Sequence, residues 1–142
     1  MDFYLLVSTV TLAIQLVIFA LLIVGFALKR QKRYRQHGFL MVAAVVLHLI
    51  SVLAVMVPSL DAIAFTPTGL PETVLALSVI HAFFGLTALV LGIWISASWR
   101  LRQSIQYCAP KKRFMLATFT VWTIAILIGA ALYFILYLPL MV

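Results

Sequence analysis

Apolar residues fill four long stretches of this 142-residue chain, and polar residues gather in the short segments between them. The four stretches cover about residues 3–28, 38–57, 73–98 and 114–138. Each reaches the roughly 20 residues that an α-helix needs to cross a hydrocarbon core about 30 Å thick. Because lipid offers no water to bond the backbone, each stretch is predicted to be a membrane-spanning helix.

Prolines mark the expected ends of the two middle spans. The second span should end at Pro58, and the third should begin after Pro71 and Glu72, because proline fits the first turn of a helix but not its interior. The segment between them, about residues 59–72, is expected to be a stiff loop. Short connections make successive helices antiparallel neighbours. The predicted fold is therefore all-α, with residues 1–142 forming one transmembrane domain, an antiparallel four-helix bundle.

The charged residues predict how this bundle is oriented. All ten Lys and Arg residues lie in two segments, about residues 29–37 and 99–113, and the three acidic residues lie outside them. An excess of Lys and Arg in short loops marks the cytoplasmic side. We therefore expect a multi-pass protein of the cell membrane, with both basic segments in the cytoplasm and both chain termini outside.

The amino-acid composition favours membrane lipids as partners over nucleic acid. With 66% hydrophobic and 9% charged residues, the chain is far from a soluble domain, which is about half apolar and a quarter charged. Its net charge of +7 suits anionic membrane lipids, at about 1 kcal/mol for each basic residue near their headgroups. Basic residues are hardly interleaved with aromatic ones, so nucleic acid is not an expected partner. Cys108 is the only cysteine, which excludes an internal disulfide and a multi-cysteine metal site.

Two histidines are expected at nearly the same depth in the membrane. His48 lies about ten residues from the outer end of the second span and His81 about eight from that of the third, roughly 15 and 12 Å deep at about 1.5 Å of rise per residue. Ionisable groups inside a membrane are costly, so by default they indicate function. Histidine is a common axial ligand of haem iron, and His48 and His81 on adjacent helices could therefore hold one haem b.

Small and polar side chains accompany the histidines at helical spacing. In the third span Gly85 follows His81 by one turn, in a groove of small residues where a flat ring could lie. In the first span Gln15 lies near mid-membrane, where its amide could hold an imidazole N–H. Near the basic side, His37 and Met41 are four residues apart and could bind copper(I), which prefers soft ligands. The same inward faces should include Ser78, Ala88 and Gly92 in the third span, Ala44 and Ser51 in the second, and Trp122, Gly129 and Tyr133 in the fourth.

Three interpretations of these polar groups stay open. They could ligate haem b. They could instead form a satisfied polar cluster, because small residues serve close helix packing and polar side chains commonly bond across spans. A proton, quinone or copper role is the third. No carboxylate lies within a span and no phosphate-binding glycine loop is present, so an independent enzyme is not indicated and no catalytic residue is assigned.

Three segments carry a resemblance to a known family. They are residues 37–44 (HGFLMVAA) at the entry to the second span, residues 81–85 (HAFFG) in the third, and residues 112–133 in the last. These resemble a family of small four-helix membrane proteins of uncharacterised function, which includes bacterial factors needed to mature haem-copper terminal oxidases. Lys111 departs from the family, which has a histidine before the last span, and His48 matches no family position. A looser likeness links the chain to small membrane b-type cytochromes, which also pair histidines across helices.

The resemblance implies a respiratory context. The leading expectation is a small membrane subunit or cytochrome-like component of a respiratory or electron-transfer complex, holding one haem b. Its expected partners are other membrane subunits and a quinone-type carrier. The alternatives are an assembly factor for a haem-copper oxidase and a purely structural accessory subunit of a larger membrane complex.

Overall fold

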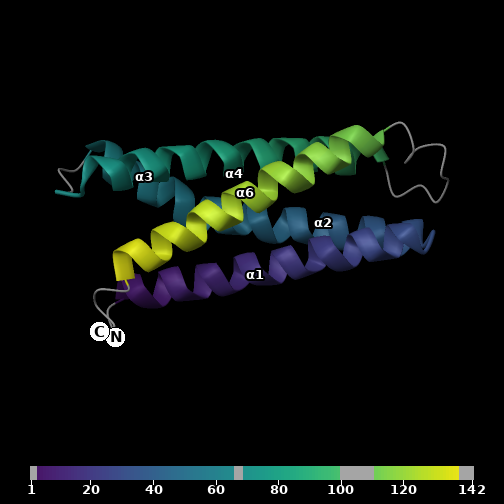
Figure 1. The fold of residues 1–142 in the computed structure, drawn as a ribbon, viewed down its shortest axis with the longest axis horizontal. Coiled ribbons are helices and arrows are strands. Elements are labelled where there is room, and N and C mark those ends of the chain that lie inside the picture. Colours follow the sequence, from purple (N-terminus) through teal and green to yellow (C-terminus); the bar gives the residue numbers. More distant parts are fainter. Residues whose placement is uncertain (1–2, 66–68, 100–110, 138–142) are drawn as a thin grey trace.

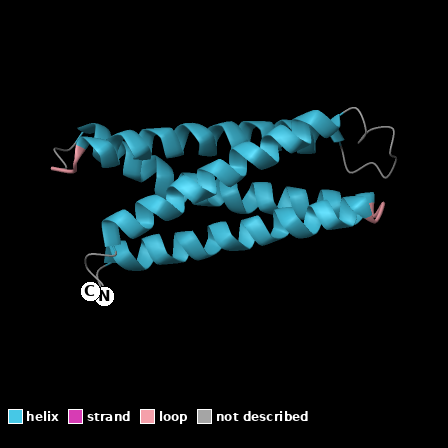
Figure 2. Cartoon of the chain, viewed as in Figure 1, coloured by secondary structure: helices cyan, strands magenta, loops and turns pink. Residues whose placement is uncertain are grey.

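The computed structural model describes residues 3–65, 69–99 and 111–137, and every element in these ranges is helical (Figure 2). The elements are α1 (Phe3–Arg30), α2 (Tyr34–Ser51), the π-helical segment η1 (Val52–Met56), α3 (Val57–Phe65), α4 (Glu72–Trp99) and α6 (Lys112–Tyr137). Four helical runs are long and apolar enough to cross a membrane, namely Leu5–Arg30, Tyr34–Asp61, Glu72–Ser98 and Lys112–Tyr137. Over the described residues, the prediction of an all-α fold with four long apolar helices is confirmed.

The prediction that the second span ends at Pro58 is wrong. α2, η1 and α3 follow one another without a break, so the helical run continues through this proline to Phe65. The predicted loop of residues 59–72 is therefore helical at its start, while residues 66–68 lie outside the described ranges. The start of the third span is confirmed, since α4 begins at Glu72, directly after Pro71.

A widened helical turn explains why Pro58 does not end the helix. Proline lacks an N–H, and its ring presses on the carbonyl four residues earlier. The π-helical turn lies just before it, and here the N–H of Val57 bonds the carbonyl of Val52, five residues back. The Ser59 hydroxyl also donates to the carbonyl of Val55 at 2.7 Å. Such π-turns and serine hydroxyls allow helices in lipid to accommodate proline.

The helices pack side by side along the length of the molecule. α1 packs along α2, and α4 along α6, while α6 crosses the bundle obliquely (Figure 1). At one end α6 lies against α4, where the rings of Trp94 and Phe114 are 5.2 Å apart. At the other end α6 reaches α1, where the hydroxyls of Ser8 and Tyr137 share a 2.9 Å hydrogen bond. We call the first the turn end, because it holds the turn of residues 31–33, and the second the terminal end.

A narrow core runs along the middle of the bundle around Trp122, which is 2% exposed. Its other members are Ile18, Leu22, Ala44, Val45, Val52, Ala88, Leu89 and Ile126. Large apolar side chains also cover the outside, including Phe83, Val90 and Leu127, which are 66%, 64% and 64% exposed. A soluble protein rarely exposes extensive apolar surface. This distribution is the one expected of helices surrounded by lipid.

The tight turn between α1 and α2 depends on Lys32, whose φ of 61° lies in the left-handed region. Its N–H bonds the carbonyl of Lys29, and the N–H of Arg33 bonds that of Leu28, the pattern of a Schellman helix end. A left-handed L-residue costs about 1–2 kcal/mol, so glycine is favoured here. Lys32→Gly should therefore raise the melting temperature of the purified protein in detergent, whereas Gln31→Gly should lower it. Equal effects of the two changes would contradict the assignment of strain to Lys32.

Candidate functional site

Each of the three histidines donates a ring N–H to a backbone carbonyl of another helix. The bonds are His37 Nδ1 to Gly25 (2.8 Å), His48 Nε2 to Gly85 (3.1 Å) and His81 Nδ1 to Ala125 (2.9 Å). They tie α2 to α1, α2 to α4, and α4 to α6. A carbonyl only accepts, so in each neutral ring the other nitrogen carries a lone pair. Each histidine therefore presents one nitrogen that can accept a hydrogen bond or bind a metal.

Glycines line the helix faces that these rings approach. A Cβ at Gly129 would stand 2.7 Å from Cε1 of His81, so no larger residue fits there unless the ring moves. At Gly85 a Cβ would stand 4.0 Å from Nε2 of His48, which is ordinary contact. Gly129 follows Ala125 by one helical turn, and the His81 ring reaches the Ala125 carbonyl. The missing side chain at Gly129 is what lets α4 and α6 share this bond.

His48 and His81 line one cavity, of about 290 Å³, at the terminal end of the bundle. Gln15 of α1 and Gly85 of α4 line it as well. Its volume is close to the lower limit of the roughly 300–1,000 Å³ found for pockets that bind organic ligands. The structure thus brings to one cavity all four residues that the sequence assigned to a haem site, and we call this the large cavity.

Several buried polar atoms at and beside the large cavity lack a hydrogen-bond partner among the described residues. They are Nδ1 of His48, Oγ of Ser51 and Nε1 of Trp122. The Trp122 and His48 rings lie 4.9 Å apart. Buried polar atoms are normally bonded, so these three are groups that a ligand or a water would satisfy. His48 and Ser51 line the large cavity, whereas Trp122 lines a second cavity described below. Within the described ranges Gln15 makes no hydrogen bond to either histidine, so its predicted role in holding an imidazole stays a prediction.

The donor chemistry of the two histidines fits an iron-binding role. Metal-binding histidines usually donate their other ring N–H to a carbonyl or carboxylate, which fixes the ring. Both histidines do so here, and this leaves Nε2 of His81 and Nδ1 of His48 as the nitrogens with lone pairs. The same carbonyl bonds also serve helix packing in membranes. The residues therefore suit both haem ligation and a structural polar cluster.

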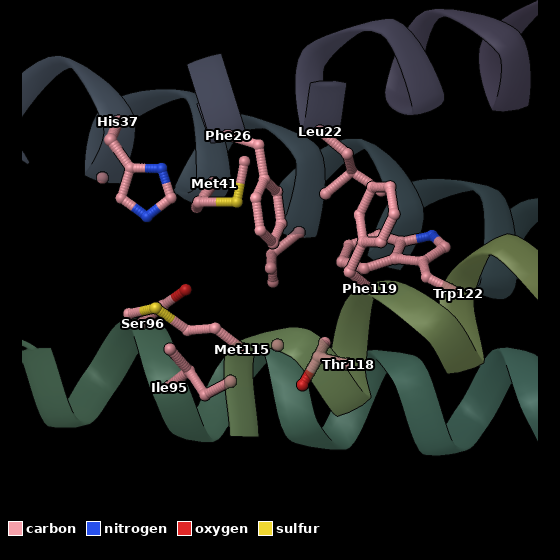
Figure 3. A pocket seen from close by; sticks show the side chains of 13 residues that line it. Leu22, Phe26, His37, Met41, Ile95, Ser96, Met115, Thr118, Phe119 and Trp122 are labelled. Carbon is pink, nitrogen blue, oxygen red and sulfur yellow. The ribbon is translucent and has the colours of Figure 1, made fainter. Parts of the chain in front are cut away.

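His37 and Met41 line a second cavity, of about 50 Å³, nearer the turn end (Figure 3). We call it the small cavity. Met115 of α6 lines it too, and the sequence analysis did not single this residue out. Its only signal in the sequence is that it follows the second basic segment by two residues, while His37 is the last residue of the first. Tertiary packing alone brings the two methionines and the histidine to one cavity.

Comparison of the chain with known proteins identifies no relative. The chain matches no protein-family model, no curated protein and no solved structure. No group of three or more His, Cys, Asp or Glu side chains placed to hold a metal occurs within residues 3–65, 69–99 and 111–137. The chemistry of the site therefore rests on the histidines, methionines and cavities described above.

Proposed function

We propose that this chain is a small membrane subunit or cytochrome-like component of a respiratory or electron-transfer complex, and that it holds one haem b in the large cavity. The observation that carries the proposal is that His48 and His81, from two helices, line one cavity, and that the carbonyl bond of each ring uses only one of its two nitrogens. Haem would supply an iron that takes up and releases one electron, and histidine is a common axial ligand. His48 and His81 would be the residues that bind it.

The chain's own residues orient these ligands and keep water from them. The carbonyls of Gly85 and Ala125 accept the imidazole N–H groups, which fixes each ring and raises the basicity of its second nitrogen. Trp122 packs against the His48 ring, with the ring centroids 4.9 Å apart, and belongs to the buried core beside it. Apolar surroundings and hydrogen bonds to the ligands are the means by which a protein tunes a haem potential. These features support electron transfer in preference to chemistry on a bound substrate.

The proposed orientation is an antiparallel bundle in the cell membrane with both termini outside. Basic residues at the turn end support it, since Lys29 and Arg30 end α1 while Lys112 and Arg113 begin α6. Such residues mark the cytoplasmic side. The large cavity then lies in the outer half of the membrane and the small cavity in the cytoplasmic half.

Cysteine labelling of intact cells tests this orientation. In a Cys108→Ser background, Glu72→Cys at the exposed start of α4 should react with a membrane-impermeant maleimide. Gln31→Cys, in the exposed turn at the other end, should react only after the membrane is opened. The reverse pattern would place the basic segments outside and contradict the orientation.

A purely structural accessory subunit is the second candidate, and the three histidine–carbonyl bonds favour it. They join α1 to α2, α2 to α4 and α4 to α6, which is what helix packing without a cofactor requires. Each interhelical bond of this kind contributes about 1 kcal/mol in a membrane. The likeness of residues 37–44 to oxidase maturation factors supports a variant of the first candidate, in which haem is held for transfer to an oxidase.

A reduced-minus-oxidised absorption spectrum of the purified protein separates the two candidates. The haem proposal predicts the bands of a b-type haem, either as purified from cells supplied with haem or after haemin is added. A structural subunit shows no specific haem absorbance in either preparation. That second result would contradict the proposed function.

A further inference from the structure

The haem proposal leaves the small cavity without a role. Its volume of about 50 Å³ is far below the roughly 300–1,000 Å³ of pockets for organic ligands. By this measure a cavity needs about 10–15 Å³ to hold one water, so this space has room for a few waters or for one metal ion. It lies between α1, α2, α4 and α6, apart from the large cavity that His48 and His81 line.

One imidazole and two thioethers line this space. Figure 3 shows the ring of His37 and the sulfurs of Met41 and Met115 at one end of the cavity, with Phe119 and Trp122 at the other. The His37 ring donates its Nδ1–H to the carbonyl of Gly25 at 2.8 Å, so its lone pair is on Nε2. This carbonyl bond is the support that metal-binding histidines usually have.

Gly25 also lies against both the His37 ring and the Met41 side chain. Its ideal Cβ position is 3.6 Å from Nδ1 of His37 and 3.7 Å from Sδ of Met41, and the methyl carbon of Met41 already fills that position. The imidazole and the first thioether therefore pack against the same spot on α1. Met115 comes from the opposite side of the cavity, on α6.

The donor set selects among metal ions. Among the described residues that line the cavity there is no carboxylate, and the hydroxyls of Ser96 and Thr118 are the side-chain oxygens there. Mg²⁺, Ca²⁺ and Mn²⁺ are usually bound by carboxylates, so this set of donors does not favour them. Thioether sulfur suits copper(I), and imidazole is an accepted copper ligand. All three side chains are neutral donors, so a monovalent ion brings one unit of charge into the span instead of two. Moving a monovalent ion from water into an apolar medium costs less free energy than moving a divalent ion.

The Lys29 ammonium faces these donors, and its positive charge opposes a cation. Its Nζ lies 3.4 Å from Sδ of Met115. Lys29 is in the last turn of α1, and its long flexible stem can carry the ammonium toward the membrane surface. The nearby positive charge should weaken cation binding, and removing it should strengthen binding.

We propose that the small cavity is a copper(I) site, in which Nε2 of His37 and the sulfurs of Met41 and Met115 bind one ion. The site is independent of the haem proposal, because the two cavities share none of the three ligands. The metal is held as copper(I) throughout, and no redox step is involved.

A copper(I) titration tests the proposal. The full-length protein is used with Cys108→Ser, because the thiol of Cys108 would itself bind copper. In detergent, under anaerobic and reducing conditions, this protein competes for copper(I) with a chromogenic chelator. One equivalent should bind. Met41→Leu and Met115→Leu should each weaken binding by about tenfold or more, since even the outer partners of metal ligands are worth about 10–100-fold. Leucine keeps the volume and apolar character of methionine, so these variants should fold normally.

Three comparisons complete the test. Met56→Leu, which removes a thioether from the large cavity, should leave copper affinity unchanged. Lys29→Gln should tighten binding, because it removes the ammonium beside Met115. X-ray absorption of the loaded protein should show sulfur bound to copper. The proposal would be overturned if copper affinity were the same in Met41→Leu and Met115→Leu as in the parent. It would also be overturned if the Cys108→Ser protein bound no copper at all.

Discussion

His81→Ala and His48→Ala should each abolish the haem spectrum of the purified protein or convert it to that of a haem with one ligand fewer. Each change removes an axial ligand of the same iron in the large cavity. Loss of a hydrogen-bond partner of a metal ligand lowers metal affinity about 10–100-fold. Loss of the ligand itself should therefore lower haem affinity by more than this. The measurement is haem content and the reduced-minus-oxidised spectrum at matched protein concentration. Added imidazole should restore the six-coordinate spectrum, because it can enter the space that the side chain has left.

His37→Ala is the matched control for this prediction. His37 is also buried, at 4% exposed, and also donates to a carbonyl of a neighbouring helix. Its loss therefore removes a comparable interhelical bond, but from the small cavity. The haem spectrum should persist in this variant. An equal loss of haem from all three alanine variants would show that the histidines act through helix packing and not as ligands.

Gly129→Ala should displace the His81 ring and destabilise the bundle. The new Cβ would stand 2.7 Å from Cε1 and 3.3 Å from Nδ1 of His81, and Nδ1 is the atom that bonds the Ala125 carbonyl. Overpacking of this kind typically costs about 1–3 kcal/mol. Because the displaced ring also loses its support, haem content should fall together with the melting temperature in detergent.

Gly85→Ala makes the same chemical change where there is room for it. Its Cβ would meet Sδ of Met56 at 3.7 Å and Nε2 of His48 at 4.0 Å, which are ordinary contacts. Alanine is also the better helix former by about 1 kcal/mol. This variant should therefore be as stable as the parent or more stable, and should keep its haem. If Gly85→Ala and Gly129→Ala lose stability alike, close contact at Gly129 is not what positions His81.

Hydropathy alone was sufficient to locate the four long apolar helices. The positions of charged residues and prolines predicted some of the helix ends but not all of them. α1, α4 and α6 begin and end within two residues of the predicted spans at residues 3–28, 73–98 and 114–138. The helix around Pro58 could not be predicted, because a proline ends a helix only where nothing compensates for the lost N–H. Here the π-turn before Pro58 accommodates the proline, and this turn depends on the folded geometry.

The candidate site was predictable where it depends on helical spacing and not where it depends on helix contacts. The 3.6-residue period was enough to put His48, Ser51 and Ala44 on one buried face. The expected depths took Pro58 as a helix end, which is wrong, yet His48 and His81 do line one cavity. No pattern within a single span could identify the carbonyl partners of the histidines or the position of Met115. The bond of His81 to Ala125 and the position of Met115 follow from how α6 crosses the bundle (Figure 1), and the other two bonds from how α2 packs on α1 and α4.

The electron paramagnetic resonance spectrum of the oxidised, haem-loaded protein tests most directly whether two imidazoles bind one iron in the large cavity. Two axial nitrogens give a strong ligand field, so the account predicts a low-spin ferric signal for the parent protein. In His48→Ala and in His81→Ala this signal should give way to a high-spin one, whereas His37→Ala should keep the low-spin signal. A high-spin signal in the parent protein, or a low-spin signal that survives both alanine changes in the large cavity, would contradict the account.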